Sequence, residues 1–170
     1  MVDRETFDRL MLDHLSAALR FAIRLLGDPH EAEDLVQEAM LRAARNWKSF
    51  RGASSFRTWL FQILINAFRD RLRGKRARSE VMDDDVCDVR SIDPLIATQG
   101  AEMAEIVAKL VSSLPARQRE VLVLVVYEQM SSSDVAKMLE MTEQNVRTNL
   151  HFARQRLKAQ LGPYMSENTR

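Results

Sequence analysis

Aromatic and cationic side chains are interleaved in residues 47–57, which read WKSFRGASSFR. Rings stack on unpaired bases and Lys or Arg side chains pair with phosphates, so this combination suits single-stranded nucleic acid. Gly52 and its serine neighbours favour a mobile loop. Packing of the same rings into a core is the alternative at this point. The candidate contact residues are Trp47, Lys48, Phe50, Arg51, Ser54 and Ser55.

A polar stripe continues along the helix that we predict from Phe56 to Arg73. Its members recur every three or four residues and therefore share one ridge, while apolar residues fill the two flanking faces. The ridge consists of Thr58, Gln62, Asn66, Arg69 and Arg73. Such a ridge can face either water or a ligand. Among the aromatic residues of this helix, we expect Trp59, Phe61 and Phe68 to pack in the core.

A dense group of cations occupies the end of the same helix, and Asp70 is the one acidic residue among them. The group comprises Arg69, Arg71, Arg73, Lys75, Arg76 and Arg78. One or two cations are enough to complement a helix dipole. We therefore expect this group to contact nucleic-acid phosphates.

A helix-turn-helix is predicted within residues 131–157. The first helix begins at Ser132 or Ser133, a tight turn follows at Glu140 and Met141, and Thr142 caps the second helix. Polar side chains at the front of a second helix are the groups that read base edges in the major groove. The candidate contacts are Thr142, Gln144, Asn145, Arg147, Thr148, His151 and Arg154.

An acidic helix is predicted from Pro29 to about Asn46, with Asp28 as its N-cap. Its outer face combines acidic and amide groups with one exposed leucine. An acidic, partly apolar face of this kind can dock a basic helical partner. The face consists of Asp34, Gln37, Glu38 and Leu41.

The composition indicates a helical protein of one or two small domains. The chain has 170 residues, of which 46% are hydrophobic and 29% charged, with only five glycines and four prolines. Further helices are expected over 4–26, over 101–113 and from Pro115, where Glu120 should point outward. We predict an all-α fold of two small helical domains, 1–78 and 101–170, joined by an acidic flexible linker at 79–100.

The residue content argues against metal or redox chemistry. The His30–Glu31 pair lacks the second histidine of a zinc-protease motif, because Asp34 stands at that position. The single cysteine, Cys87, cannot form an internal disulfide, which suits a reducing cytoplasm. No apolar run is long enough for membrane insertion. We expect no catalytic residues, no metal and no cofactor.

Four segments together resemble bacterial RNA polymerase sigma factors of the extracytoplasmic-function (ECF) group. They are GDPHEAEDLVQEAMLRA at 27–43, FRGASSFRTWLFQILINAFRDRLR at 50–73, LPARQREVLVL at 114–124 and SSSDVAKMLEMTEQNVRTNLHFARQRL at 131–157. The resemblance extends over nearly the whole chain. It implies a promoter-specificity subunit without catalytic activity.

The resemblance also implies partners for each candidate surface. Asp34, Gln37, Glu38 and Leu41 would dock on the clamp helices of the RNA polymerase core. The segment 47–55 and the ridge of the following helix would capture and melt the minus-ten element of promoter DNA. The helix-turn-helix would read the minus-thirty-five element through Gln144, Asn145, Arg147, Thr148 and His151. An anti-sigma factor would cover both kinds of surface.

Three positions depart from the family pattern. Glu140 stands in the helix-turn-helix turn where relatives usually have glycine, so a left-handed backbone there would be strained. Asn149 and Phe152 occupy positions that are often basic in relatives. These changes predict weak phosphate affinity and an unusual promoter preference. A stand-alone helix-turn-helix regulator, with residues 1–78 as a dimerisation or sensor domain, is the alternative function.

Overall fold

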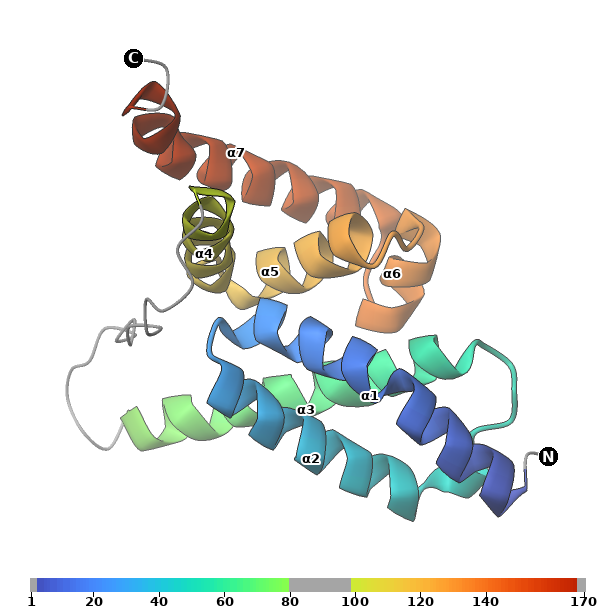
Figure 1. Cartoon of the computed structure of the whole chain (residues 1–170). Helices are drawn as coiled ribbons and strands as arrows, with labels where there is room; N and C mark the ends of the chain where they lie inside the picture. Colours follow the sequence, from blue (N-terminus) through green and yellow to red (C-terminus); the bar gives the residue numbers. More distant parts are fainter. Residues whose placement is uncertain (1–2, 80–98, 168–170) are drawn as a thin grey trace. The chain divides into compact units, whose positions relative to one another are not determined.

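The computed structural model describes residues 3–79 and 99–167, and every regular element within these ranges is helical (Figure 1). The chain divides into two compact units, Met1–Ile92 (unit 1) and Asp93–Arg170 (unit 2). The predicted all-α fold with two helical domains is therefore confirmed. The predicted linker, with Cys87 and most of the acidic run, lies outside the described residues apart from its helical ends at 79 and 99–100.

The described part of unit 1 contains α1 (Arg4–Leu26), α2 (Pro29–Arg45), the short 3-10 turn η1 (Trp47–Ser49) and α3 (Phe56–Ser79). Gly27 ends α1 in a left-handed conformation with φ 74°, which glycine adopts without steric cost. Asp28 caps α2, because its Oδ1 accepts from the Glu31 backbone N–H at 2.9 Å. The predicted start of this helix is confirmed. Helix α3 continues six residues beyond its predicted end at Arg73.

Helices α1, α2 and α3 pack against one another (Figure 1), and their buried apolar side chains form one core. Phe21 of α1 stacks on Phe61 of α3 with ring centroids 4.3 Å apart. Phe61 and Phe68 are buried as predicted, whereas Trp59 is only partly buried. The largest fully buried side chains of this unit are Phe7, Phe21, Leu25, Leu35, Leu60, Phe61, Leu64, Ile65 and Phe68.

The described part of unit 2 contains α4 (Gln99–Ser112), α5 (Ala116–Leu122), the π-helical turn η2 (Val123–Tyr127), α6 (Ser132–Leu139) and α7 (Glu143–Glu167). Helix α7 contacts α4, α5 and α6 and so organises this unit. Val146 and Ala153 of α7 are buried, and Val135 and Leu139 of α6 are buried with them, as predicted. This packing fixes α6 and α7 as a helix-turn-helix.

Glu120 of α5 is buried, so the prediction that it points outward is wrong. Only 1% of the residue is exposed, and Arg117 Nη1 lies 3.4 Å from its Oε2. A carboxylate removed from water costs free energy unless a cation or hydrogen-bond donor compensates it. Arg117 supplies such compensation from one helical turn away. The prediction that Glu120 is exposed rested on its charge, and the charge does not show that Arg117 can pair with a buried carboxylate.

Glu140 adopts the left-handed conformation at the end of α6, with φ 53° and ψ 52°. Its backbone N–H bonds to the Lys137 carbonyl oxygen at 3.4 Å, and the Met141 N–H bonds to the Ala136 oxygen at 3.0 Å. The turn therefore keeps the backbone expected for glycine while carrying a side chain. An L-residue with a Cβ atom is strained in this region.

Replacing Glu140 by glycine should raise the free energy of unfolding of unit 2 by about 1 kcal/mol, because glycine has no Cβ atom to strain. Thermal unfolding followed by far-ultraviolet circular dichroism measures this gain, and tryptophan fluorescence recorded in parallel identifies the transition of unit 1, which contains both tryptophans. Glu140→Ala is the matched control, since alanine removes the carboxylate and keeps the Cβ atom. An equal gain from alanine would show that charge, and not backbone strain, is the cause.

Candidate nucleic-acid interface

The aromatic residues of the loop before α3 and of the first turn of α3 form a cluster with Phe7 of α1. Phe7 is fully buried, and its ring centroid lies 5.5 Å from that of Phe56, 5.9 Å from that of Trp59 and 6.2 Å from that of Trp47. Phe50 packs edge-on against Phe56 at 5.2 Å and is only 7% exposed. The expectation of an accessible Phe50 ring is corrected: this ring belongs to the core. Trp47 remains half-buried and so presents part of its ring at the surface.

The polar residues of the same loop remain at the surface. Lys48, Arg51 and Ser54 are exposed. Ser55 is exposed as well, but its Oγ caps α3 by accepting from the Thr58 N–H at 3.1 Å, and it lies 2.8 Å from Thr58 Oγ1. The buried rings thus anchor a loop whose cationic and hydroxyl groups point to solvent.

The polar ridge of α3 lies at the surface of unit 1, as its spacing predicts. Asn66 and Arg73 are exposed, and Thr58, Gln62 and Arg69 are half-buried. Gln62 Nε2 donates to Asn66 Oδ1 at 3.4 Å. Both amides keep further donors and acceptors, which is what contact with base edges requires.

Two cations at the end of α3 bind acidic residues of α2. Arg71 donates from Nε to Glu38 Oε2 at 3.2 Å and from Nη1 to the Glu31 carbonyl oxygen at 3.2 Å. Lys75 Nζ donates to the Glu31 carboxylate at 3.0 and 3.1 Å. The prediction that the whole cationic group faces phosphates, opposed by Asp70 alone, is wrong for Arg71 and Lys75. Their four-residue spacing places them on the side of α3 that packs against α2.

The outer face of α2 presents the residues predicted to dock a protein partner. Asp34 and Gln37 are exposed, and Leu41 is 58% exposed. Glu38 is half-buried, because Arg42 Nη2 binds its Oε1 at 2.5 Å and Arg71 binds its other oxygen. An exposed leucine flanked by carboxylates is suited to a cationic, partly apolar partner. Glu38 can contact such a partner only while it is also paired with Arg42 and Arg71.

Arg42 and Asp70 join α2 to α3, and neither residue was predicted to have this role. Arg42 Nη1 lies 2.6 Å from Asp70 Oδ2, and this hydrogen bond raises the pKa of Arg42. The same bond is the largest cause that lowers the pKa of Asp70, and the bond from Arg73 adds to it. In the sequence, the position of Asp70 as the one acidic residue in a basic run is the feature that could have indicated an ion pair here.

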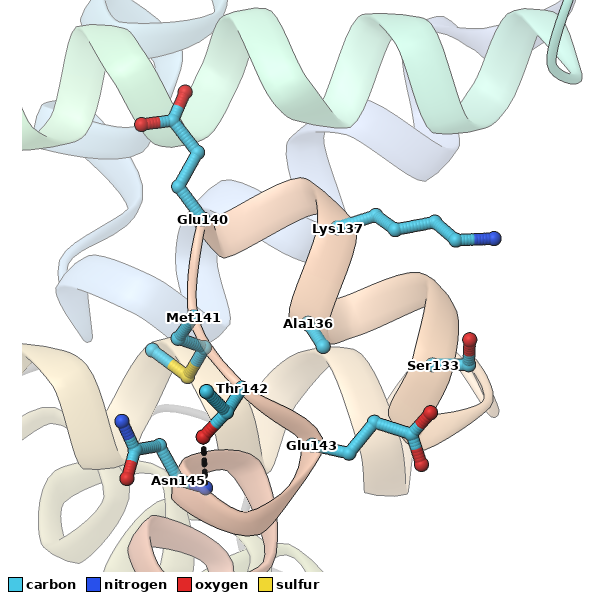
Figure 2. Close-up of a pocket in the computed structure, with 8 residues that line it drawn as sticks. All are labelled: Ser133, Ala136, Lys137, Glu140, Met141, Thr142, Glu143 and Asn145. Atoms are coloured by element: carbon cyan, nitrogen blue, oxygen red, sulfur yellow. Dashed lines mark hydrogen bonds between the residues drawn. The ribbon is translucent and has the colours of Figure 1, made fainter.

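The turn between α6 and α7 is open and lined by polar side chains. Figure 2 shows Thr142 at the start of α7, where its Oγ1 accepts from the Asn145 N–H at 3.1 Å. Thr142 caps the second helix as predicted, and Ser131 caps the first by accepting from the Asp134 N–H. The residues around the hollow at this turn are Ser133, Ala136, Lys137, Glu140, Met141, Thr142, Glu143 and Asn145.

The front of α7 exposes the predicted reading residues. The exposed side chains are Thr142, Gln144, Asn145, Arg147, Thr148, His151 and Arg154. Arg147 Nη2 binds Glu143 Oε2 at 3.2 Å, and Asn149 Nδ2 donates to the Asn145 carbonyl oxygen at 2.8 Å. Phe152 is 49% exposed and packs edge-on against His151. This face can hydrogen-bond to bases and, through Phe152, offer an apolar contact.

Within the described residues, no three His, Cys, Asp or Glu side chains come together in a way that could hold a metal ion. Among the helices of 3–79 and 99–167, none is long and apolar enough to span a bilayer.

Two family models match the chain in order. Sigma-70 region 2 matches residues 10–78, and Sigma-70 region 4 matches residues 104–157. The RNA polymerase sigma-H factor of Pseudomonas aeruginosa is 32% identical over 97% of this chain and 91% of that protein. The ECF sigma factor EcfG of Rhodopseudomonas palustris is 38% identical over 91% of this chain and 86% of that protein.

The chain belongs to the ECF sigma factors.

Two solved structures have a fold similar to that of this ECF sigma factor. The sigma factor RpoE, crystallised with the anti-sigma factor NepR from Bartonella quintana, matches with a TM-score of 0.81 and 29% identity over 93% of this chain and 98% of that chain. CnrH, solved with the cytosolic domain of CnrY, shares the fold with a TM-score of 0.66 and 24% identity. The RpoE match covers 93% of this ECF sigma factor, so both unit 1 and unit 2 have counterparts in that structure.

Membership of the ECF sigma factors decides between the two interpretations of the helix-turn-helix. A stand-alone regulator would need residues 1–78 to be a sensor or dimerisation domain, whereas residues 10–78 match Sigma-70 region 2. Helix α6 and the first part of α7 lie within the segment that matches Sigma-70 region 4. The alternative of an independent repressor or activator is not favoured.

Proposed function

We infer that this ECF sigma factor directs the RNA polymerase core to promoters through two separate reading surfaces. The observation that carries this inference is the ordered match of region 2 and region 4, each with its polar side chains exposed on a packed helical frame. Within the described residues, neither surface carries a group of three His, Cys, Asp or Glu side chains that could hold a metal ion. We propose that the chain is a specificity subunit without enzymatic activity and that it acts in the cytoplasm with polymerase.

We propose that α2 docks on the polymerase through Asp34, Gln37, Glu38 and Leu41. Asp34 is fully available for a cationic partner, and Leu41 supplies apolar area that water otherwise contacts. The ion pairs of Glu38 with Arg42 and Arg71 hold that carboxylate at a fixed place on the face. The Glu38 carboxylate is therefore preorganised, which reduces the entropy that this side chain loses on binding.

The loop 47–55 and the ridge of α3 are proposed to bind the melted minus-ten strand. Lys48, Arg51 and Arg73 offer cations for phosphates, while Gln62 and Asn66 offer amides for base edges. Extracting a base from the stack costs a few kcal/mol, which contacts to the extracted base can offset without nucleotide hydrolysis. Because Phe50 is buried, the exposed part of Trp47 is the stacking surface of this loop.

The front of α7 is proposed to read the minus-thirty-five element in the major groove. Gln144 and Asn145 can form paired hydrogen bonds with adenine, and Arg147 can do so with guanine. These residues lie in the first turns of α7, where a recognition helix meets base edges. An anti-sigma factor that covers these surfaces is the proposed regulator, and the similar sigma factor RpoE of Bartonella quintana was crystallised in complex with the anti-sigma factor NepR.

Transcription in vitro with purified core polymerase tests the proposed function. Adding the chain to the core enzyme on a genomic fragment library should start RNA chains at a defined set of promoters, and the chain should co-elute with the core. The chain alone should bind duplex DNA poorly. Tight duplex binding without polymerase, together with unchanged start sites, would contradict the proposal.

Replacing Arg147 by alanine should lower affinity for the upstream element by about 1–3 kcal/mol and relax base preference at one position. Run-off transcription on promoters with single-base changes in that element measures both effects. Arg156→Ala is a matched control, since Arg156 is an exposed arginine on the opposite side of α7 from Arg147. It should leave the pattern of base preference unchanged. The same loss of preference from both variants would count against base reading by Arg147.

A further inference from the structure

Four charged side chains connect the outer face of α2 with the polar ridge of α3. Arg42 Nη2 binds Glu38 Oε1 at 2.5 Å, and Arg42 Nη1 binds Asp70 Oδ2 at 2.6 Å. The other oxygen of Asp70 accepts from Arg73 Nη2. The order is thus Glu38, Arg42, Asp70 and Arg73. Glu38 belongs to the proposed polymerase surface and Arg73 to the proposed DNA surface, whereas the two middle residues belong to neither.

Asp70 and a nucleic-acid phosphate would compete for the same guanidinium. The Arg73 side chain is 76% exposed, so a phosphate can approach it, but Asp70 already occupies Nη2 one helical turn away. Ion pairs at such exposure are worth about 0–1 kcal/mol, which a phosphate contact can displace. The strength of the Asp70–Arg73 pair therefore sets how readily Arg73 is released.

Arg42 controls the strength of that pair because it shares the charge of Asp70. The Asp70 carboxylate is divided between Arg42 and Arg73, and the Arg42 guanidinium is divided between Asp70 and Glu38. If a cationic partner neutralises Glu38, Arg42 is attracted to Asp70 alone. Asp70 then attracts Arg73 less strongly, and Arg73 is released towards a phosphate.

We propose that Arg42 and Asp70 are positioning residues that couple the α2 docking face to the α3 nucleic-acid surface. The coupling is positive: a cationic partner on Glu38 strengthens phosphate binding by Arg73. It is also reciprocal, so nucleic acid on Arg73 strengthens docking on α2. This inference rests on the proposed binding of nucleic acid by the loop 47–55 and the ridge of α3.

Fluorescence anisotropy of a labelled single-stranded DNA 20-mer of random sequence, titrated with the full chain at low salt, tests the coupling. Asp70→Asn should tighten binding by about two- to fivefold, since it releases Arg73. Arg42→Gln should weaken binding by a similar factor. Without the Arg42 guanidinium, Arg73 becomes the remaining partner of Asp70 in this chain of ion pairs, so Asp70 binds Arg73 more strongly. Both variants break the same Arg42–Asp70 pair, so a purely structural role would move both affinities in one direction.

Two background variants separate the specific contact from a general change of net charge. Glu38→Gln mimics a partner that neutralises Glu38 and should tighten binding, and this gain should vanish when Arg42→Gln is also present. The gain from Asp70→Asn should likewise vanish with Arg73→Gln. Glu33→Gln removes one exposed carboxylate from the same helix as Glu38 and should change affinity by less than about 1.5-fold.

The salt dependence provides a second measurement. Asp70→Asn adds one phosphate contact, so the slope of log K against log salt should steepen by about 0.7. Glu38→Gln leaves the Arg42–Asp70 pair intact and so tests the coupling even if Asp70→Asn weakens the fold.

Failure of the coupling can be told apart from failure of the proposed function. Lys48→Gln combined with Arg51→Gln should weaken binding of the 20-mer, because both cations lie on the proposed nucleic-acid surface. If this double variant leaves affinity unchanged, the proposed surface is wrong. If the double variant weakens binding but Asp70→Asn has no effect on affinity, the coupling is wrong. The coupling is also wrong if Asp70→Asn tightens binding equally with and without Arg73→Gln.

Discussion

A chain carrying Asp34→Lys and Leu41→Ala should lose affinity for the RNA polymerase core by on the order of 100-fold or more, while its helical circular dichroism spectrum stays intact. Asp34 is exposed and Leu41 is 58% exposed on the same face of α2. Placing a lysine opposite a cationic partner costs several kcal/mol. Size-exclusion chromatography with purified core enzyme measures the loss.

Glu38 is the wrong residue for a charge reversal, although it belongs to the same proposed surface. Arg42 and Arg71 both bind its carboxylate, so a lysine there would place three cations together and disturb the contact of α2 with α3. Asp13→Lys is the matched control, since Asp13 is an exposed carboxylate on α1. It should leave polymerase binding unchanged. Retained binding by the Asp34→Lys, Leu41→Ala chain would remove α2 from the docking surface.

Local signals in the sequence predicted the helices and the exposure of the ridge of α3 and the front of α7. Asp28 followed by Pro29 specifies a helix start, and Gly27 specifies the end of the helix before it, because these residues satisfy backbone groups locally. The same holds for Thr142 at the start of α7. Helical spacing alone then placed the ridge of α3 and the front of α7 at the surface.

Contacts between helices were beyond what spacing could predict. Arg71 and Lys75 look like phosphate ligands in a basic run, but their partners Glu31 and Glu38 stand more than thirty residues earlier in the chain. A single sequence shows the charge of each residue and not which helix faces it. Phe50 illustrates the same limit, since its burial depends on packing against Phe56 of α3.

The buried aromatic cluster connects stability to the nucleic-acid surface of unit 1. Phe7 contacts the rings of Trp47, Phe56 and Trp59, and Phe50 closes the cluster from the loop side. The exposed cations of the loop are therefore held by a mostly buried cluster, of which Trp47 presents part of its ring at the surface. Weakening the cluster should loosen the loop before it unfolds the helices.

Replacing Phe7 by alanine should accordingly destabilise unit 1 by about 3–5 kcal/mol, the range for deleting a buried phenyl ring. Both tryptophans of the chain, Trp47 and Trp59, contact Phe7, so tryptophan fluorescence reports on unit 1 alone. The fluorescence melting temperature should fall by about 10 °C or more. Single-stranded DNA binding should fall as well, at temperatures where the helices remain folded.

Leu12→Ala is the matched control for this prediction. Leu12 lies on the same helix as Phe7 but is 73% exposed, so its truncation should change stability by no more than about 0.5 kcal/mol. Similar melting temperatures for the two variants would mean that Phe7 does not organise the cluster. A large loss of stability without any loss of DNA binding would mean that the loop keeps its conformation independently of the rings. Only the combination of lower stability and weaker binding supports a loop whose position depends on the buried aromatic residues.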